Sequence, residues 1–278
     1  MKVGLHVSIA GSIDVAVDNA RESNCDTFQM FTRNPRGWKF RDLDSEEIKR
    51  FKDKLAEAGI GPAVSHMPYL PNLACPEDEL YEKSEASLLA EVDRCERLGV
   101  AYIVTHLGSH LGRGREVGLE RLSNALNLAA KRAKECQILL ENMAGQANSM
   151  GSTFKDVKEI LDSVKRSDHL GVCLDTCHCY AAGQDLHTEK SVDATLAKFD
   201  DIVGFERLKV VHLNDSKGGL GSGLDRHEHI GMGYIGEKGF KAFLHHSAIS
   251  GLPMILETPE DERRDAKGNL ALIRKLGK

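Results

Sequence analysis

The chain has 278 residues, of which 41% are hydrophobic and 28% are charged, and its formal net charge is −5. This composition supports a sizeable buried core and excludes a chain that remains disordered. The acidic balance also excludes a protein that coats nucleic acid through bulk positive charge, because phosphate contacts from Lys and Arg dominate such binding. Any contact with DNA must therefore be local.

The cysteines and apolar runs indicate the cellular compartment. Seven cysteines without any C-x-x-C pair argue against a disulfide framework and favour a reducing compartment. The short apolar run from Met1 to Ile9 is not followed by a small-residue cleavage site, so we expect a strand there and not a signal peptide. No apolar stretch approaches the roughly 20 residues of a membrane span. We therefore expect a cytoplasmic protein with no membrane association.

Short apolar or β-branched runs alternate with amphipathic stretches along the whole chain, which is typical of βα units and a parallel sheet. We expect strands to begin near Val3, Thr27, Ala63, Ala101, Gln137, Gly171, Leu208 and Leu252. Amphipathic stretches such as Glu79–Leu98 and Leu119–Lys134 predict helices between these strands. Eight similar units predict an α/β fold closed into a (β/α)8 or TIM barrel, with residues 1–278 forming a single domain.

Capping signals mark several helix boundaries. Asp44, followed by Ser45 and two glutamates, and Thr153, preceded by Ser152, are typical of helix starts. Gly59 and Gly99 stand where left-handed residues would end the preceding helices.

A potential metal ligand stands at the last residue of each predicted strand from the third to the eighth. These residues are His66, His106, Glu141, Asp175, His212 and Glu257. Because the carboxyl ends of barrel strands converge on one rim, we expect the six side chains to form one cluster. Singly, each would be interpreted as a capped or hydrogen-bonded loop residue. Together they favour a metal centre, since burying several carboxylates is prohibitive unless cations compensate them.

Three further candidates follow closely along the chain. His178 lies three residues after Asp175, and Asp225 and His227 form an alternating pair. Nitrogen and oxygen donors of this kind favour Zn²⁺, with Mn²⁺ acceptable at one or more positions, and nine donor residues exceed what one tetrahedral ion needs. We therefore expect two or three ions. Thiolates are the remaining alternative, because the spacing leaves ligation open for Cys173, Cys177 and Cys179, for which buried packing is the simpler interpretation.

Several segments of the chain resemble the endonuclease IV family of zinc-dependent abasic-site (AP) endonucleases. The signature segments are ENMAGQ (141–146), GVCLDTCHCYAAG (171–183) and HLNDSKGGLGSGLDRHEHIGMG (212–233). Similarity also runs through GLHVSIAGS (4–12), FTRNPRGW (31–38), residues 66–73 and THLGSHLG (105–112), so it covers essentially the whole chain. The resemblance implies a trinuclear zinc site on a TIM barrel. It also implies hydrolysis of the phosphodiester bond 5′ to an abasic site, leaving a 3′-hydroxyl and a 5′-deoxyribose phosphate.

The resemblance also implies roles for individual residues. It assigns His66 and His106 to one zinc ion, Asp175, His212 and Glu257 to a second, Glu141 to a bridge between these two, and His178, Asp225 and His227 to a third. It places Arg36 and Tyr69 where family members insert side chains into the duplex at the lesion. We hypothesise that Glu141 and Glu257 are catalytic and orient the attacking nucleophile. The expected partner is double-stranded DNA that contains abasic sites, and the protein is expected to act as a monomer.

The loop after the second strand is a candidate for further DNA contacts. Its basic residues interleave with aromatic ones, a mixture suited to phosphate contact and stacking, although an ordinary solvated loop would have the same composition. The residues are Arg33, Arg36, Lys39 and Arg41 with Trp38 and Phe40. His6 and His110, which lie near strand ends, are candidates for supporting the metal ligands.

Two other functions remain open from the residues alone. A metal-dependent sugar isomerase or epimerase could use the same barrel with one or two ions, but it would leave His178, Asp225 and His227 without a role. Alternatively, a binding protein could use the metal ions only to stabilise its fold, and could recognise damaged DNA or a partner without cleaving it.

Overall fold

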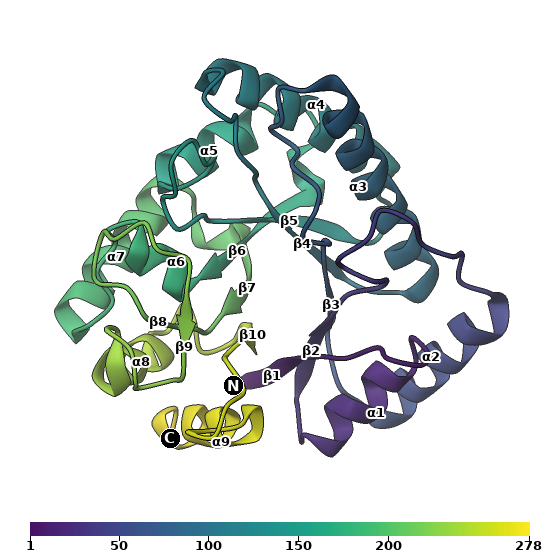
Figure 1. Ribbon diagram of the computed structural model, residues 1–278. Helices are drawn as coiled ribbons and strands as arrows, with labels where there is room; N and C mark the ends of the chain where they lie inside the picture. Colours follow the sequence, from purple (N-terminus) through teal and green to yellow (C-terminus); the bar gives the residue numbers. More distant parts are fainter.

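The computed structural model, which describes residues 1–278, is a closed barrel of eight parallel strands surrounded by helices (Figure 1). The barrel strands are β1 (Lys2–Val7), β2 (Thr27–Met30), β3 (Ala63–His66), β4 (Tyr102–His106), β5 (Gln137–Glu141), β6 (Leu170–Asp175), β7 (Leu208–His212) and β10 (Pro253–Leu256). Each strand begins within one residue of its predicted start. β1 closes the barrel by pairing with both β2 and β10. The prediction of a TIM barrel is therefore confirmed.

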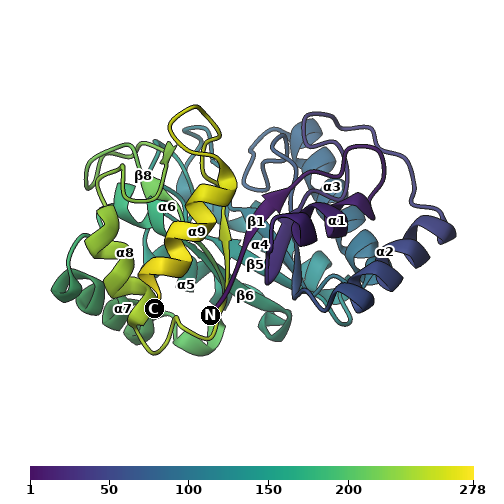
Figure 2. The ribbon, with the colours of Figure 1, turned by 90° about the horizontal axis from the view of Figure 1, so that it is seen from below.

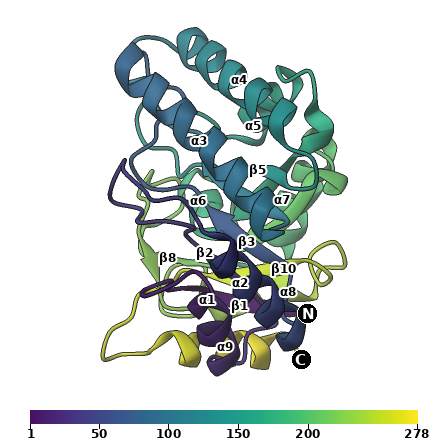
Figure 3. The same cartoon turned by 90° about the vertical axis from the view of Figure 1, so that its right-hand side faces the viewer.

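Helices follow the strands and cover the outside of the barrel. They are α1 (Val15–Glu22), α2 (Ser45–Ala58), α3 (Asp78–Leu98), α4 (Arg115–Arg132), α5 (Phe154–Asp162), α6 (Thr176–Ala181), α7 (Glu189–Ile202), α8 (Gly236–His245) and α9 (Ala266–Leu276). Figures 2 and 3 show both chain termini at the same end of the molecule. Two short strands, β8 (Asp215–Ser216) and β9 (His227–Glu228), pair antiparallel outside the barrel. None of the helices combines the length and the apolar character needed to cross a membrane.

The capping residues behave as predicted, but both boundaries of one predicted helix were wrong. Asp44 accepts a hydrogen bond from the backbone of Glu47 at 2.8 Å, and Gly59 and Gly99 end their helices in the left-handed conformation. The predicted helix Leu119–Lys134 instead begins at Arg115 and ends at Arg132. The sequence prediction excluded its first turn, which contains Gly118. A side chain at Gly118 would come within 3.0 Å of His110 and Met150, so close packing explains the glycine.

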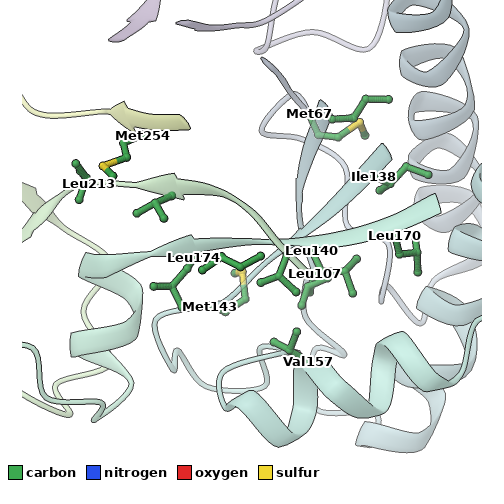
Figure 4. Packing of buried hydrophobic residues seen from close by; sticks show 14 of the residues in the cluster. Met67, Leu107, Ile138, Leu140, Met143, Val157, Leu170, Leu174, Leu213 and Met254 are labelled. Atoms are coloured by element: carbon green, nitrogen blue, oxygen red, sulfur yellow. The ribbon is translucent and has the colours of Figure 1, made fainter. Parts of the chain in front are cut away.

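The core has two layers because strand side chains alternate between the barrel interior and the helices. The interior layer consists of Val64, Val104, Leu139, Cys173, Val210 and Ile255. The larger outer layer lies between the strands and the helices. Figure 4 shows part of it, with Leu107, Leu140 and Met143 packed between the strands and the helix that carries Val157. Six of the eight barrel strands, β3 to β7 and β10, therefore present one face to each layer.

Glu96 fastens the end of α3 to the segment that leads into β5. Its Oε1 accepts hydrogen bonds from the backbone N–H groups of Lys134, Glu135 and Cys136 at 2.8, 3.0 and 3.1 Å. Burial alone would raise the pKa of Glu96, but these N–H groups outweigh it and lower the pKa from 4.5 to about 2. A carboxyl whose pKa is depressed by folding stabilises the fold above its unfolded pKa, and this contribution is lost as the pH falls towards its folded pKa.

We therefore expect the variant Glu96→Gln to melt at a lower temperature than the wild-type protein at pH 7. The difference should shrink as the pH falls from about 4.5 towards about 2, because the wild-type carboxylate then becomes neutral as well. Thermal unfolding of both proteins across this pH range measures the difference in melting temperature. The other titrating groups are the same in both proteins, so their contributions cancel in this difference. The exposed Glu135→Gln is the matched control and should show no such trend. A difference that does not vary with pH would contradict this account.

Candidate metal centre

The six predicted strand-end ligands form the uppermost layer of the barrel interior. Each lies two residues after the interior residue of its strand, as His66 follows Val64 and Glu141 follows Leu139. Because side chains alternate along a strand, residues two positions apart point to the same side. The register places ligands of neighbouring strands side by side, since His106 pairs with Glu141. The predicted cluster at the carboxyl ends of the strands is therefore present.

Glu141, at the end of β5, is the centre of this cluster. Its Oε2 lies 3.2 Å from Nε2 of His66 and 3.2 Å from Nε2 of His106. Its Oε1 lies 2.9 Å from Nδ1 of His212 and 3.5 Å from Nδ1 of His178. Burial favours the neutral acid, but His212 and His106 outweigh it and hold the pKa of the Glu141 carboxyl well below its usual value. One buried carboxylate thus connects four imidazole rings.

A second group of donors surrounds His212. Its Nδ1 lies 3.4 Å from Oε2 of Glu257 and 3.9 Å from Oδ2 of Asp175. His212 and Asp175 are fully buried, whereas the side chain of Glu257 is 20% exposed and lines the cavity above. With Glu141, these residues place four potential ligand atoms within 4.8 Å of one another.

A third group combines α6 with the excursion between β8 and β9. Asp175 caps α6 by accepting the backbone N–H of His178 at 2.7 Å, which sets the start of the helix and the position of that imidazole. Nε2 of His178 lies 3.0 Å from Oδ1 of Asp225, and Nε2 of His227 lies 3.9 Å from the same oxygen. Burial alone would raise the pKa of the Asp225 carboxyl. The nearby His178 and His227 outweigh this effect and lower the pKa to about 2.

The donor set fits divalent metal ions. Its potential ligand atoms converge within 4.8 Å in three groups, which are His66, His106 and Glu141; Glu141, Asp175, His212 and Glu257; and His178, Asp225 and His227. Nε2 of His227 is buried and has no hydrogen-bond partner, although it faces Asp175 at 3.7 Å. Imidazole nitrogens and carboxylate oxygens are suitable ligands for zinc, and a cation would compensate the buried carboxylates. That these nine residues bind ions stays a prediction.

The cysteines occupy buried positions around the centre. Cys173 belongs to the barrel interior, and Cys179 is also buried. Cys177 comes within reach of Asp175 and His227, but its thiol contacts the backbone oxygen of Arg226 at 3.5 Å. Burial raises the pKa of the Cys177 thiol, which favours the neutral group over a thiolate ligand.

Two asparagines that were not predicted from the sequence hold the ligands in place. Asn214 donates a hydrogen bond to Oδ2 of Asp175 at 2.7 Å and accepts the backbone N–H of Glu257 at 2.8 Å. Asn142 exchanges two hydrogen bonds with the backbone of Asp175, at 3.1 and 2.8 Å. Each asparagine lies one or two positions after a predicted ligand, which was the available signal. Of the two predicted supporting histidines, His6 contacts Glu257 at 3.4 Å, whereas the His110 backbone pairs with Asn148 and Arg113.

A cavity of about 580 Å³ opens above the centre. His66, His106, His178 and His227 line it, and the buried Glu141, Asp175 and His212 lie beneath them. Tyr69, which is 61% exposed, stands at the rim with its ring 5.1 Å from that of Phe31. The loop that carries the exposed Arg36 is adjacent, because the backbone N–H of Tyr69 donates to the oxygen of Pro35 at 3.1 Å.

The basic loop after β2 is only partly available to a ligand. Arg33 was predicted as a phosphate contact, but it is buried and lies 3.4 Å from Glu91. Arg41 forms an ion pair with Glu47. Arg36 and Lys39 are exposed. The expectation was therefore wrong for Arg33, because α3 places a buried carboxylate beneath the loop.

Comparisons with known proteins agree with this architecture. The family model described as "Xylose isomerase-like TIM barrel" matches residues 17–276. The chain is 55% identical to "Probable endonuclease 4" of Methanoculleus marisnigri over 276 residues, covering 99% of this chain and 98% of that protein. The crystal structure of endonuclease IV from Thermus thermophilus superposes with a TM-score of 0.88 at 39% identity, covering 99% of this chain and 98% of that one. A D-tagatose 3-epimerase-like protein has a TM-score of 0.77 at 20% identity and covers 99% of this chain and 97% of its own, a likeness of fold alone. The chain therefore belongs to the endonuclease IV family.

Proposed function

We propose that this protein hydrolyses the phosphodiester bond 5′ to abasic sites in double-stranded DNA, leaving a 3′-hydroxyl and a 5′-deoxyribose phosphate, with three zinc ions. Membership of the endonuclease IV family makes the chain a DNA-repair nuclease. The observation that carries the finer proposal is the third donor group, formed by His178, Asp225 and His227. A sugar isomerase or epimerase with one or two ions would leave this group without a role.

The nine donor residues would hold the ions in the three groups described above, with Glu141 shared between two of them. When bound, divalent ions supply Lewis acidity towards a phosphate oxygen and make water more acidic. Glu141 and Glu257 are the carboxylates that would orient the attacking water, because Glu257 reaches the cavity wall and Glu141 lies beneath it. The buried floor of the cavity would exclude bulk solvent from the far side of the phosphate.

The test of this proposal is incubation of the protein with a duplex that carries one stable abasic analogue, with and without a chelator. We expect a single incision on the 5′ side of the lesion, a 3′ end that a polymerase can extend, and loss of the incision on chelation. Zinc should restore the activity. Cleavage on the 3′ side, or incision that survives exhaustive chelation, would overturn the proposal.

Arg36 and Tyr69 would bind the DNA at the lesion. We expect Arg36→Ala to weaken binding to abasic DNA by about 1–3 kcal/mol while the zinc content stays that of the wild-type protein, because Arg36 is exposed beside the cavity and touches no donor group. Fluorescence anisotropy with a labelled duplex and elemental analysis measure the two quantities. Arg21→Ala, at the exposed end of α1, is the matched control. Loss of zinc with unchanged DNA affinity would contradict this assignment.

A further inference from the structure

A buried amide, Gln29, crosses the barrel interior beside the proposed metal centre. It is the penultimate residue of β2, where the register pairs it with His6 of β1 and Val64 of β3. Its side chain is completely buried. A buried amide is unfavourable unless its two N–H donors and its carbonyl oxygen find partners. An apolar side chain of similar size would need no such partners, so the presence of glutamine at this position requires an explanation.

The amide of Gln29 has three hydrogen-bond partners, and two of these partners are proposed metal ligands. Nε2 of Gln29 lies 2.7 Å from Oε1 of Glu257 and 3.0 Å from Nδ1 of His6. Its Oε1 lies 2.8 Å from Nε2 of His212. These contacts link β2 to β10 and β7, which do not pair with it in the sheet. Gln29 thus joins the two sides of the barrel at the level of the donor residues.

The chemistry of the partners fixes the direction of each hydrogen bond. The Glu257 carboxylate only accepts, so the NH2 group of Gln29 faces it and the carbonyl oxygen faces His212. His212 must then donate through Nε2–H, which leaves Nδ1 of the neutral ring without a proton. That nitrogen faces Oε1 of Glu141 at 2.9 Å and Oε2 of Glu257 at 3.4 Å. Without an ion, Nδ1 can meet these carboxylates only as the second N–H of a protonated ring, whereas in the neutral ring its lone pair is available to a metal ion.

We propose that Gln29 is a positioning residue, which sets the ring orientation and tautomer of His212 and the rotamer of Glu257. The inference rests on the proposed function, because both partners belong to the donor group assigned to one zinc ion. Removing a group that holds a metal ligand through a hydrogen bond typically weakens metal affinity 10- to 100-fold. Gln29 contacts neither His66 and His106 nor the group of His178, Asp225 and His227. Its effect should therefore be confined to one ion.

The experiment compares Gln29→Met with the wild-type protein. Methionine has a similar length but forms none of the three hydrogen bonds. Competition with a chromogenic chelator should show one ion held about 10- to 100-fold more weakly and two held as in the wild-type protein. With cobalt(II) in place of zinc, the visible absorption of one ion should change. Gln137→Met is the matched control, because Gln137 starts β5 at the opposite end of the barrel and should leave every ion unchanged.

Other outcomes separate the inference from the proposed function. If Gln29→Met retains wild-type affinity for every ion, the positioning role is wrong and the proposed function stands. If the wild-type protein binds no zinc tightly, the proposed function itself fails. If Gln29→Met does not fold, Gln29→Ala replaces it, since the smaller side chain leaves space for water. A variant that loses stability equally with and without metal, and keeps its zinc affinity, would show a packing role only and overturn the inference.

Discussion

Replacing Glu141 with glutamine is expected to lower kcat/KM for cleavage of abasic DNA by more than about 100-fold, beyond the 10- to 100-fold typical of residues that merely support a ligand. Glutamine keeps the shape of the side chain but removes the charge that faces His66, His106 and His212. Because Glu141 belongs to two of the three donor groups, at least one ion should be lost with it. A nicking assay and elemental analysis of the purified variant measure the two effects.

The control for this experiment is Glu260→Gln. Glu260 lines the same cavity but belongs to none of the three donor groups, so its replacement removes an equal charge without removing a ligand. Its metal content should equal that of the wild-type protein. If Glu141→Gln keeps a full complement of zinc and loses less than about tenfold in rate, Glu141 is not the shared ligand.

Replacing Glu91 with glutamine is expected to lower the free energy of unfolding by about 3–5 kcal/mol, as is typical when one partner of a buried ion pair is removed. Glu91 is fully buried on α3 and accepts hydrogen bonds from Thr32 at 2.8 Å and Ser65 at 2.6 Å. Its other oxygen faces Nε of the buried Arg33 at 3.4 Å. Glutamine would leave the guanidinium of Arg33 buried without its countercharge. Domains of this kind have only about 5–15 kcal/mol of stability, so the loss is large.

Chemical denaturation of both proteins measures this difference. The matched control is Asp53→Asn, which breaks the exposed pair between Asp53 and Lys49 at 2.7 Å on α2. Such exposed pairs along a helix contribute about 0.2–0.5 kcal/mol, so the control should unfold close to the wild-type protein. Equal unfolding midpoints for Glu91→Gln and Asp53→Asn would show that the buried network adds nothing beyond a surface ion pair.

The strand ends could be predicted because they depend on a local rule. His66 and His212 each end an apolar run, and the alternation along that run already determines which side of the strand they occupy. The same rule places Cys173 in the barrel interior below Asp175. Resemblance to the family was needed for Asp225 and His227, which lie on a long excursion beyond β7. The sequence of that excursion has no periodic pattern from which its return over α6 could be predicted.

The sequence by itself determined the eight strands, the closure of the barrel and the chemical character of its rim, because strand alternation and helix caps depend on residues close together along the chain. Only the tertiary structure decided which groups meet across the barrel. Gln29 and Glu257 are separated by 228 positions, and Arg33 and its partner Glu91 by 58, so neither pair leaves a local signal. These contacts form when the sheet closes and α3 packs against the loop after β2, since burial then forces each polar group to find the partner that lies nearest to it.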